Sequence, residues 1–259
     1  MKEITFMLVI VALIGSSLAC RRLTGDSSQG QYELVCRDSL AGMNALTAKL
    51  KIPEHFKQEN PVKQGGEFDP NRYFEALTHL KMREGFTLDY AYSYQGIGGQ
   101  PLLYARPVDE KPFQTEAEFN VAKPESFLYA VQTDDSPEAY LQFSLLALMG
   151  SQFYLYWHAG YNDSQVLCGL SDIERIISEN ARFDFGAKLT PMQKLKARGI
   201  SQPGPLVTIN DDRVTVSMLT FTNWGGFIQR TYTLKRAFPH TILEVQNETL
   251  VEYNCGVMF

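Results

Sequence analysis

The sequence predicts an α+β protein, with helices mainly in the first two thirds of the chain, packed on an antiparallel sheet that ends in a C-terminal β-meander. Helical periodicity and helix-capping signals fall mostly before residue 200. From residue 206 onward, segments rich in β-branched and aromatic residues follow one another. Short turn signals separate these segments, and short links between successive strands favour antiparallel pairing.

Two helices and a hairpin are expected in the N-terminal third. Apolar residues recur at helical spacing over residues 33–50, which predicts an amphipathic helix. Asp69-Pro70 supplies an N-cap and a Pro in the first turn for a second helix over residues 72–82. Residues 86–94 alternate large apolar residues with smaller or polar ones at a strict period of two, so they predict a half-buried strand. After a glycine-rich turn, residues 102–105 form the return strand.

The middle of the chain alternates between both kinds of element. Short strands are expected at residues 127–131 and 166–168, and a strongly aromatic strand at residues 152–158. Three helices are expected, each from a capping signal: residues 137–149, residues 171–180, and a short helix that begins after Thr190 and ends before Gly199.

The predicted C-terminal strands need a cover. They occupy residues 207–209, 213–222, 227–235, 241–246 and 249–257. Five strands alone leave one face of a sheet exposed, so we expect the helices to cover it and prefer a single α+β domain over residues 33–259. The segment Ser201-Gln202-Pro203-Gly204-Pro205 is the best candidate for an internal break (201–205).

Residues 1–19 are typical of an export signal peptide. Lys2 gives a positive start, an uninterrupted apolar run covers residues 6–14, and small residues follow. The run is too short to span a membrane, which takes roughly 20 apolar residues. A buried N-terminal helix is the alternative, but this run lacks the polar positions of a solvent-facing side.

The signal ends on a cysteine, in Ser17-Leu18-Ala19-Cys20. This pattern resembles the lipobox of bacterial lipoproteins over residues 1–20 only. Ala19 matches it, whereas Ser17 stands where Leu is usual and Leu18 comes one position late. The resemblance implies acylation of Cys20 and a lipid anchor in a cell-envelope membrane. Plain cleavage before Cys20, which would release a periplasmic or secreted protein, is the alternative, because a general signal peptidase accepts the same small residues.

Residues 20–32 are expected to form a flexible tether. They are polar, rich in Gly and Ser and almost without apolar side chains. In bacteria with two membranes, Arg21 directly after an acylated cysteine resembles the signal for the outer membrane. Removal of residues 1–19 takes away one Lys and one Glu, so the exported chain keeps the net charge of −5.

The four cysteines, Cys20, Cys36, Cys168 and Cys255, limit the disulfides. An acylated Cys20 leaves three thiols and at most one bridge, whereas an unmodified Cys20 allows two bridges in three connectivities. An exported protein meets an oxidising compartment, which makes a bridge plausible. We favour Cys168 with Cys255, because Cys168 lies after an aromatic strand and Cys255 lies in the last predicted strand; buried reduced thiols are the alternative.

Composition and spacing exclude several functional classes. With 44% apolar and 20% charged residues the chain is not of the disordered type, and a net charge of −5 argues against a nucleic-acid partner. No Cys/His spacing suggests a metal, and the one glycine-rich segment after a strand, residues 96–99, leads to another strand instead of a helix. We therefore expect no metal and no cofactor.

One histidine has the sequence context of a general base. His158 ends the predicted aromatic strand, and Asp163 follows the next turn, so the carboxylate could orient the imidazole. Asp135 is a second candidate carboxylate. The alternative is a turn aspartate that caps its own backbone beside a structural histidine. A secreted hydrolase that uses His158 with Asp163 is the second functional hypothesis.

Aromatic residues recur beside glycines in three predicted loops. The candidate ligand-binding residues are Tyr94, Trp157, Tyr161 and Trp224. Aromatic faces with nearby amides and hydroxyls suit a sugar or another flat small molecule, and Gly allows a ligand to approach the backbone. The alternative is that the glycines make turns and the aromatic rings belong to the core.

The leading functional hypothesis is a non-catalytic binding or interaction module at the cell envelope, held to a membrane through Cys20. It predicts a small-molecule or carbohydrate ligand at the aromatic loops and leaves a protein partner open. A plainly structural envelope component is the third hypothesis.

Overall fold

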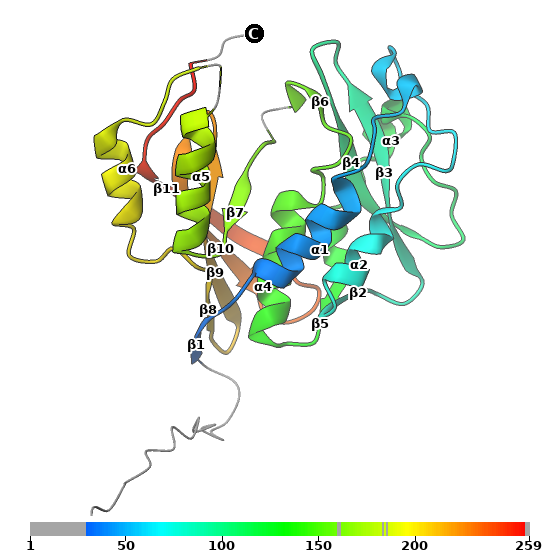
Figure 1. Ribbon diagram of the computed structural model, residues 1–259. Helices are drawn as coiled ribbons and strands as arrows, with labels where there is room; N and C mark the ends of the chain where they lie inside the picture. Colours follow the sequence, from blue (N-terminus) through cyan, green and yellow to red (C-terminus); the bar gives the residue numbers. More distant parts are fainter. Residues whose placement is uncertain (1–29, 160–161, 183, 185, 257–259) are drawn as a thin grey trace, which may run out of the picture.

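The structure mixes helices with antiparallel sheets, which confirms the α+β class (Figure 1). The computed structural model describes residues 30–159, 162–182, 184 and 186–256. No helix within these ranges is long and apolar enough to cross a membrane. The helices are α1 (Arg37–Thr47), α2 (Tyr73–Ala76), α3 (Glu116–Ala122), α4 (Pro137–Met149), α5 (Leu170–Arg182) and α6 (Pro191–Arg198). The strands are β1 (Gly30–Glu33), β2 (Leu80–Met82), β3 (Phe86–Tyr94), β4 (Gly98–Pro107), β5 (Val131–Thr133), β6 (Tyr156–Trp157), β7 (Gln165–Leu167), β8 (Leu206–Ile209), β9 (Arg213–Thr222), β10 (Gly226–Lys235) and β11 (Ile242–Val251).

The largest sheet has the strand order β1-β8-β9-β10-β11, and β7 pairs with β9 beside β8. All its pairs are antiparallel, and β8 to β11 follow one another along the chain. Strand β9 is central: Val216 pairs with Val207 of β8 on one side and with Tyr232 of β10 on the other. This sheet holds the C-terminal half of the molecule together.

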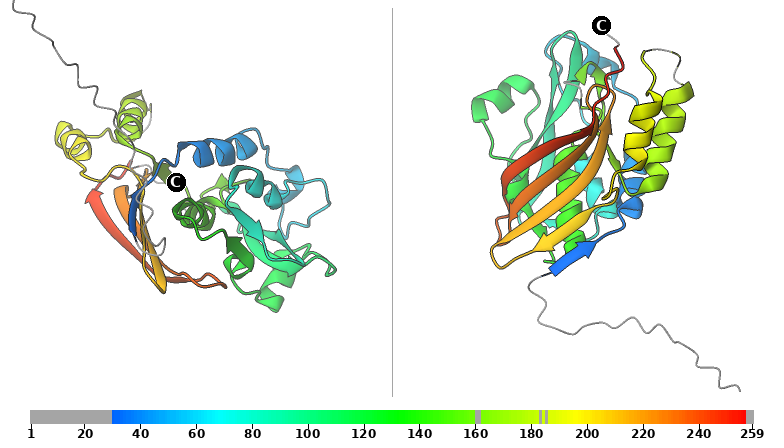
Figure 2. Two further views of the ribbon diagram at one scale, coloured as in Figure 1. Left: turned by 90° about the horizontal axis from the view of Figure 1, so that it is seen from below. Right: turned by 90° about the vertical axis from the view of Figure 1, so that its left-hand side faces the viewer.

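Helices cover both faces of the large sheet, at different ends. The buried residues Val214, Val216 and Met218 of β9 belong to a first apolar cluster that includes α4. Leu219 and Phe221 belong to a second cluster, built with α5 and α6. Residues of opposite parity point to opposite sides of a strand, so α4 and the α5–α6 pair lie on opposite faces (Figure 2).

A smaller sheet carries an aromatic core. Its strand order is β3-β4-β6, and Tyr90 and Tyr92 of β3 pack with Phe153 and with Phe56, which lies in a 3-10 helix over Glu54–Lys57. The prediction of a half-buried strand at residues 86–94 is right in its bounds but wrong in burial, because Asp89, Ala91 and Ser93 on the other face are also buried. The segment around α3 covers that face, where Tyr104 contacts Phe113 and Phe119.

Elements with strong local signals were predicted correctly. Helix α4 begins after Ser136, whose hydroxyl accepts a hydrogen bond from the Ala139 amide. Helix α6 begins with the complete capping box of Thr190 and Gln193. Each signal lies within four residues, so it acts before any distant contact forms.

Elements that depend on a distant partner strand were predicted less well. The helix expected over residues 33–50 is shortened to α1, because residues 30–33 pair with β8 as β1. The helix expected over residues 72–82 is reduced to α2, because residues 80–82 pair with β5. In the aromatic segment 152–158 only β6 forms a strand.

The prediction of two final strands in the meander is wrong, because the structure has the single strand β11 there. The two strands expected at residues 241–246 and 249–257 are one strand, because Asn247 and Glu248 continue the ladder opposite Arg230 and Gln229 of β10. The strand forms an edge of the sheet, and its residues 243–249 are all exposed.

The disulfide joins Cys36 to Cys168, so the predicted Cys168–Cys255 pair is wrong. The two Cα atoms are 5.5 Å apart, and the bond links the start of α1 to the segment between β7 and α5. Cys168 packs against the first cluster, whereas Cys255 is buried in the second cluster and makes no disulfide. Because these clusters lie on opposite faces of the sheet, the sheet itself separates Cys168 from Cys255.

Reduction of this disulfide should destabilise the protein. Its cysteines are 132 positions apart in the sequence, and opening such a long loop in the unfolded chain should lower the free energy of unfolding by about 2–5 kcal/mol. Urea unfolding with and without dithiothreitol measures this loss. The Cys36→Ala variant should no longer respond to the reductant, whereas Cys255→Ala should respond like the unaltered chain. A Cys36→Ala protein that keeps its response would contradict the pairing.

Candidate functional site

A cleft of about 660 Å³ lies between the β3–β4 hairpin and β6. It contains one of the predicted ligand-binding residues, Trp157, and the predicted base His158. The described residues that line it are Ser93, Gln95, Gly96, Ile97, Gly98, Gly99, Gln100, Tyr156, Trp157, His158 and Ala159.

Backbone pairing places Trp157 at the cleft. Gly98 and Gly99 of β4 pair with Trp157 and Tyr156 of β6, and the His158 amide donates a hydrogen bond to the Ile97 carbonyl at 3.2 Å. A Cβ atom on Gly98 would lie 2.7 Å from the backbone nitrogen of Ala159. Only Gly permits this close approach, so the hairpin glycine that the sequence placed in a turn also positions β6.

The backbone around Trp157 is strained. Tyr154, Trp157 and Ala159 have φ values of 50°, 49° and 33°, a region that residues other than Gly seldom adopt. Such strain costs of the order of 1–3 kcal/mol per residue and tends to concentrate at functional sites. The Trp157 side chain is nevertheless 68% exposed, so core packing does not explain its conformation.

The cleft offers neutral polar groups and one histidine. Its described lining has no Asp, Glu, Lys or Arg. Ser93 and Gln100 stand opposite each other in the β3–β4 ladder, and Gln95 is exposed in the hairpin loop. Amides, a hydroxyl and an exposed indole face can bind a neutral ring that has both polar and apolar surfaces.

The other predicted ligand-binding residues have different places. Tyr94 lies next to the cleft: its ring is 5.9 Å from that of Tyr156, and its hydroxyl donates to the Gly96 carbonyl. Trp224 packs against the second cluster at the β9–β10 turn and is not among the described lining residues. Tyr161 falls outside the described residues. Of the four predicted residues, the structure thus places Trp157 in the cleft and Tyr94 beside its neighbour Tyr156.

The candidate carboxylates have structural partners. Asp163 accepts hydrogen bonds from the Thr222 hydroxyl at 2.5 Å and the Asn223 amide at 3.0 Å, so it holds the β9–β10 turn. It lines a different pocket from the one that contains His158. Asp135 binds Arg236 through both oxygens, at 3.0 and 2.6 Å, and this hydrogen bonding lowers the pKa of its carboxyl.

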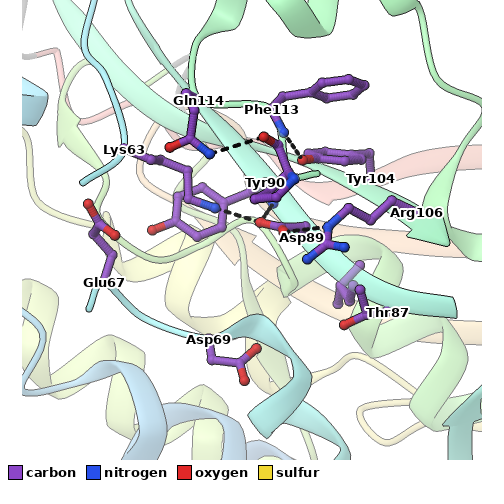
Figure 3. Close-up of polar contacts among 12 residues, drawn as sticks. Lys63, Glu67, Asp69, Thr87, Asp89, Tyr90, Tyr104, Arg106, Phe113 and Gln114 are labelled. Atoms are coloured by element: carbon purple, nitrogen blue, oxygen red, sulfur yellow. Dashed lines mark hydrogen bonds and ion pairs between the residues drawn. The ribbon is translucent and has the colours of Figure 1, made fainter. Parts of the chain in front are cut away.

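A buried charge cluster, which sequence reasoning missed, lies on the β3–β4 hairpin away from the cleft (Figure 3). Asp89 lies between Lys63, whose Nζ is 2.5 Å from Oδ1, and Arg106, whose Nε is 2.9 Å from Oδ2. The three side chains are only 12–18% exposed. The only signal was Asp89 itself, a charged residue inside an otherwise aromatic strand.

The partners of this charge cluster indicate a structural role. The Arg106 Nη1 also donates to the carbonyls of Pro107 and Glu110, which fixes the loop after β4. Lys63 also lies over the Tyr90 ring, 4.3 Å from its centroid, and so ties the preceding loop to β3. The cluster joins two loops to the hairpin that carries the cleft.

Two groups beside the cluster have shifted acidities. Burial raises the pKa of Tyr90, whose hydroxyl points toward the side on which Glu67 lies and has no hydrogen-bond partner among the described residues (Figure 3). Burial also opposes ionisation of Glu67. Hydrogen bonds from the Gln64 amide and from His55 outweigh this effect, so the pKa of Glu67 is lowered. Glu67 is therefore held as a carboxylate.

Compared with known proteins, the chain matches no protein-family model, no curated protein and no solved structure. The function of the cleft is therefore argued from its own geometry.

Replacement of Asp89 should destabilise the protein without a change to the cleft lining. Asp89→Asn leaves Lys63 and Arg106 without their shared counter-charge in a poorly solvated place, which should lower the free energy of unfolding by about 3 kcal/mol or more. Glu179→Gln is the matched control, because its ion pair with Arg175 is exposed and should contribute less than about 0.5 kcal/mol. Urea unfolding measures both, and equal losses would argue against the structural role.

Proposed function

We propose that the protein is a non-catalytic binding module of the cell envelope, held to a membrane by acylation of Cys20. In this proposal the cleft at Trp157 binds a neutral ring, most simply a sugar unit of an uncharged carbohydrate. The observation that carries the proposal is an exposed indole, held in a strained backbone conformation, beside amide and hydroxyl groups.

Support for a carbohydrate ligand comes from an aromatic surface and polar groups that lie side by side in the cleft. The apolar face of a sugar ring stacks on an aromatic side chain, while its hydroxyls need donors and acceptors such as amides. Trp157 offers the first surface, and Gln95, Gln100 and the hairpin backbone offer the second. No Asp, Glu, Lys or Arg among the described lining residues offers a counter-charge to an ionic ligand.

Support for binding over hydrolysis comes from the carboxylates. A general base at His158 would need an orienting carboxylate. Asp163 is used by Thr222 and Asn223, and Asp135 is used by Arg236. The hydrolase hypothesis therefore gains no support from these two candidates.

Two features support export: the N-terminal signal and the Cys36–Cys168 disulfide. Residues 1–19 have the layout of a signal peptide, followed at once by Cys20. The Cys36–Cys168 disulfide suits an oxidising compartment outside the cytosol.

The fluorescence of Trp157 can report sugar binding. The chain has only two tryptophans, so replacement of Trp224 leaves Trp157 as the single tryptophan. In the Trp224→Phe variant, neutral hexasaccharides of glucose or of N-acetylglucosamine should shift the remaining Trp157 fluorescence in a saturable way. Trp157→Asn removes the ring while Asn tolerates the left-handed backbone, and it should weaken binding by about 30-fold in calorimetric titrations.

The Trp224→Phe variant also serves as the control in these titrations. It should bind each sugar as tightly as the unaltered chain does. Affinity that is unchanged in Trp157→Asn, or no fluorescence response to any neutral sugar, would contradict the proposed ligand site.

Acylation of Cys20 can be tested in cells. Cells that express the chain should incorporate radioactive palmitate into it, and Cys20→Ala should abolish the label and release the protein from the membrane fraction. Cys255→Ala is the control and should remain labelled. An unlabelled chain with an intact Cys20 would refute the lipid anchor and leave plain secretion.

A further inference from the structure

Helix α6 and the residues before it form a locally basic surface. Residues 187–199 contain Lys188, Lys194, Lys196 and Arg198 and no acidic residue, although the whole chain has a net charge of −5. We call this set, with Met192 and Leu195, the α6 basic surface. The left view of Figure 2 shows α6 on the outside of the molecule, next to α5.

Two large apolar side chains project from the same surface. Met192 is 60% exposed and Leu195 is 64% exposed. They are three residues apart on a helix, so they are neighbours on one side of it. Isolated exposed apolar residues are ordinary, but here a pair lies between lysines.

Arg198 contributes less charge than the lysines do. It binds Glu174 of α5 through two hydrogen bonds, at 2.6 and 2.9 Å, so its charge is largely compensated. Within the described part of the chain, Lys188, Lys194 and Lys196 form no salt bridge. The α6 basic surface thus carries three lysines outside any salt bridge among the described residues, on the helix that presents the two apolar side chains or just before it.

The surface is held in place before any partner binds. The Thr190–Gln193 capping box starts the helix, and Ala197 is buried in the second cluster. The Asn180 side chain accepts a hydrogen bond from the Leu189 amide at 2.7 Å, which positions the segment next to Lys188. A partner would therefore not have to order this helix, and that lowers the cost of binding.

We propose that the α6 basic surface docks on an anionic lipid surface, with Met192 and Leu195 inserted at the level of the headgroups. Lysine ammonium groups complement the negative charge of lipid headgroups, and apolar side chains between them gain from burial at the acyl boundary. A polyanion such as a nucleic acid would use the charges alone and would leave the apolar pair in water. This docking is independent of acylation at Cys20 and would add a second point of attachment to the membrane.

A reporter on α6 tests the proposal in the full chain. Leu195→Trp, combined with Trp157→Phe and Trp224→Phe, makes position 195 the only tryptophan. Vesicles of phosphatidylcholine with phosphatidylglycerol, in which the acyl chains carry bromine, should quench this tryptophan and shift its emission to the blue. Vesicles of phosphatidylcholine alone should not, and high salt should reverse the effect. Attachment through the N-terminus does not by itself bring position 195 into contact with lipid, so the reporter separates docking from anchoring.

Charge reversal supplies matched variants. Lys188→Glu, Lys194→Glu and Lys196→Glu together should lower the apparent partition of the reporter by more than about 100-fold, because each lysine near an anionic membrane contributes about fivefold. Lys49→Glu, Lys51→Glu and Lys111→Glu change the net charge equally at exposed positions elsewhere and should leave the partition nearly unchanged.

A second measurement avoids substitutions altogether. Hydrogen–deuterium exchange of the unaltered chain should show protection of residues 188–198 with anionic vesicles and none with neutral ones. Absence of both quenching and protection would overturn the proposal. Salt-sensitive binding to heparin without quenching by brominated lipid would also overturn it, and would assign the surface to a polyanion instead.

Discussion

Strand β9 buries one face at its start and the other at its end, and the arrangement of the rest of the molecule depends on this change of side. Val214, Val216 and Met218 point to one face, whereas Leu219 and Phe221 point to the other. The shift occurs between two consecutive residues, so each end of the strand requires a helical cover on a different face. Helix α4 supplies one cover and the α5–α6 pair supplies the other (Figure 2).

The sequence predicted the fold class and many elements but not the way they assemble, because some conformations are set by neighbouring residues and others by distant strands. Capping signals at Ser136 and Thr190 act over a few residues and were read correctly. Residues 80–82 and 247–248 were misassigned because their conformation is set by strands far away in the sequence. The change of phase from Met218 to Leu219 is visible in the sequence and could have indicated two opposed helical layers. Partner choice, as for Cys168, was not visible there.

The sequence indicated the residue types of the candidate site but not which segments come together to form it. The association of aromatic residues with glycines is a local feature of the sequence, and it singled out Trp157, which lies in the cleft, and Tyr94, which lies beside Tyr156. The pairing of Gly98 with Trp157 forms the cleft, and it depends on two segments about sixty residues apart. The structure also separates two environments on one hairpin: the ion pairs of Asp89 are internal, whereas the described lining of the cleft has no Asp, Glu, Lys or Arg. The side chains that fix the hairpin are thus different from those that line the cleft.

The long edge strand β11 has a consequence for how copies of the protein behave in a crowded compartment. Its exposed backbone could extend the sheet into a neighbouring molecule, as unprotected edges do in aggregation. Glu244 and Glu248 stand on this edge, and both are exposed. Two molecules that approach edge to edge would bring four carboxylates together and repel each other. Glu244 and Glu248 thereby oppose edge-to-edge pairing of two copies through β11.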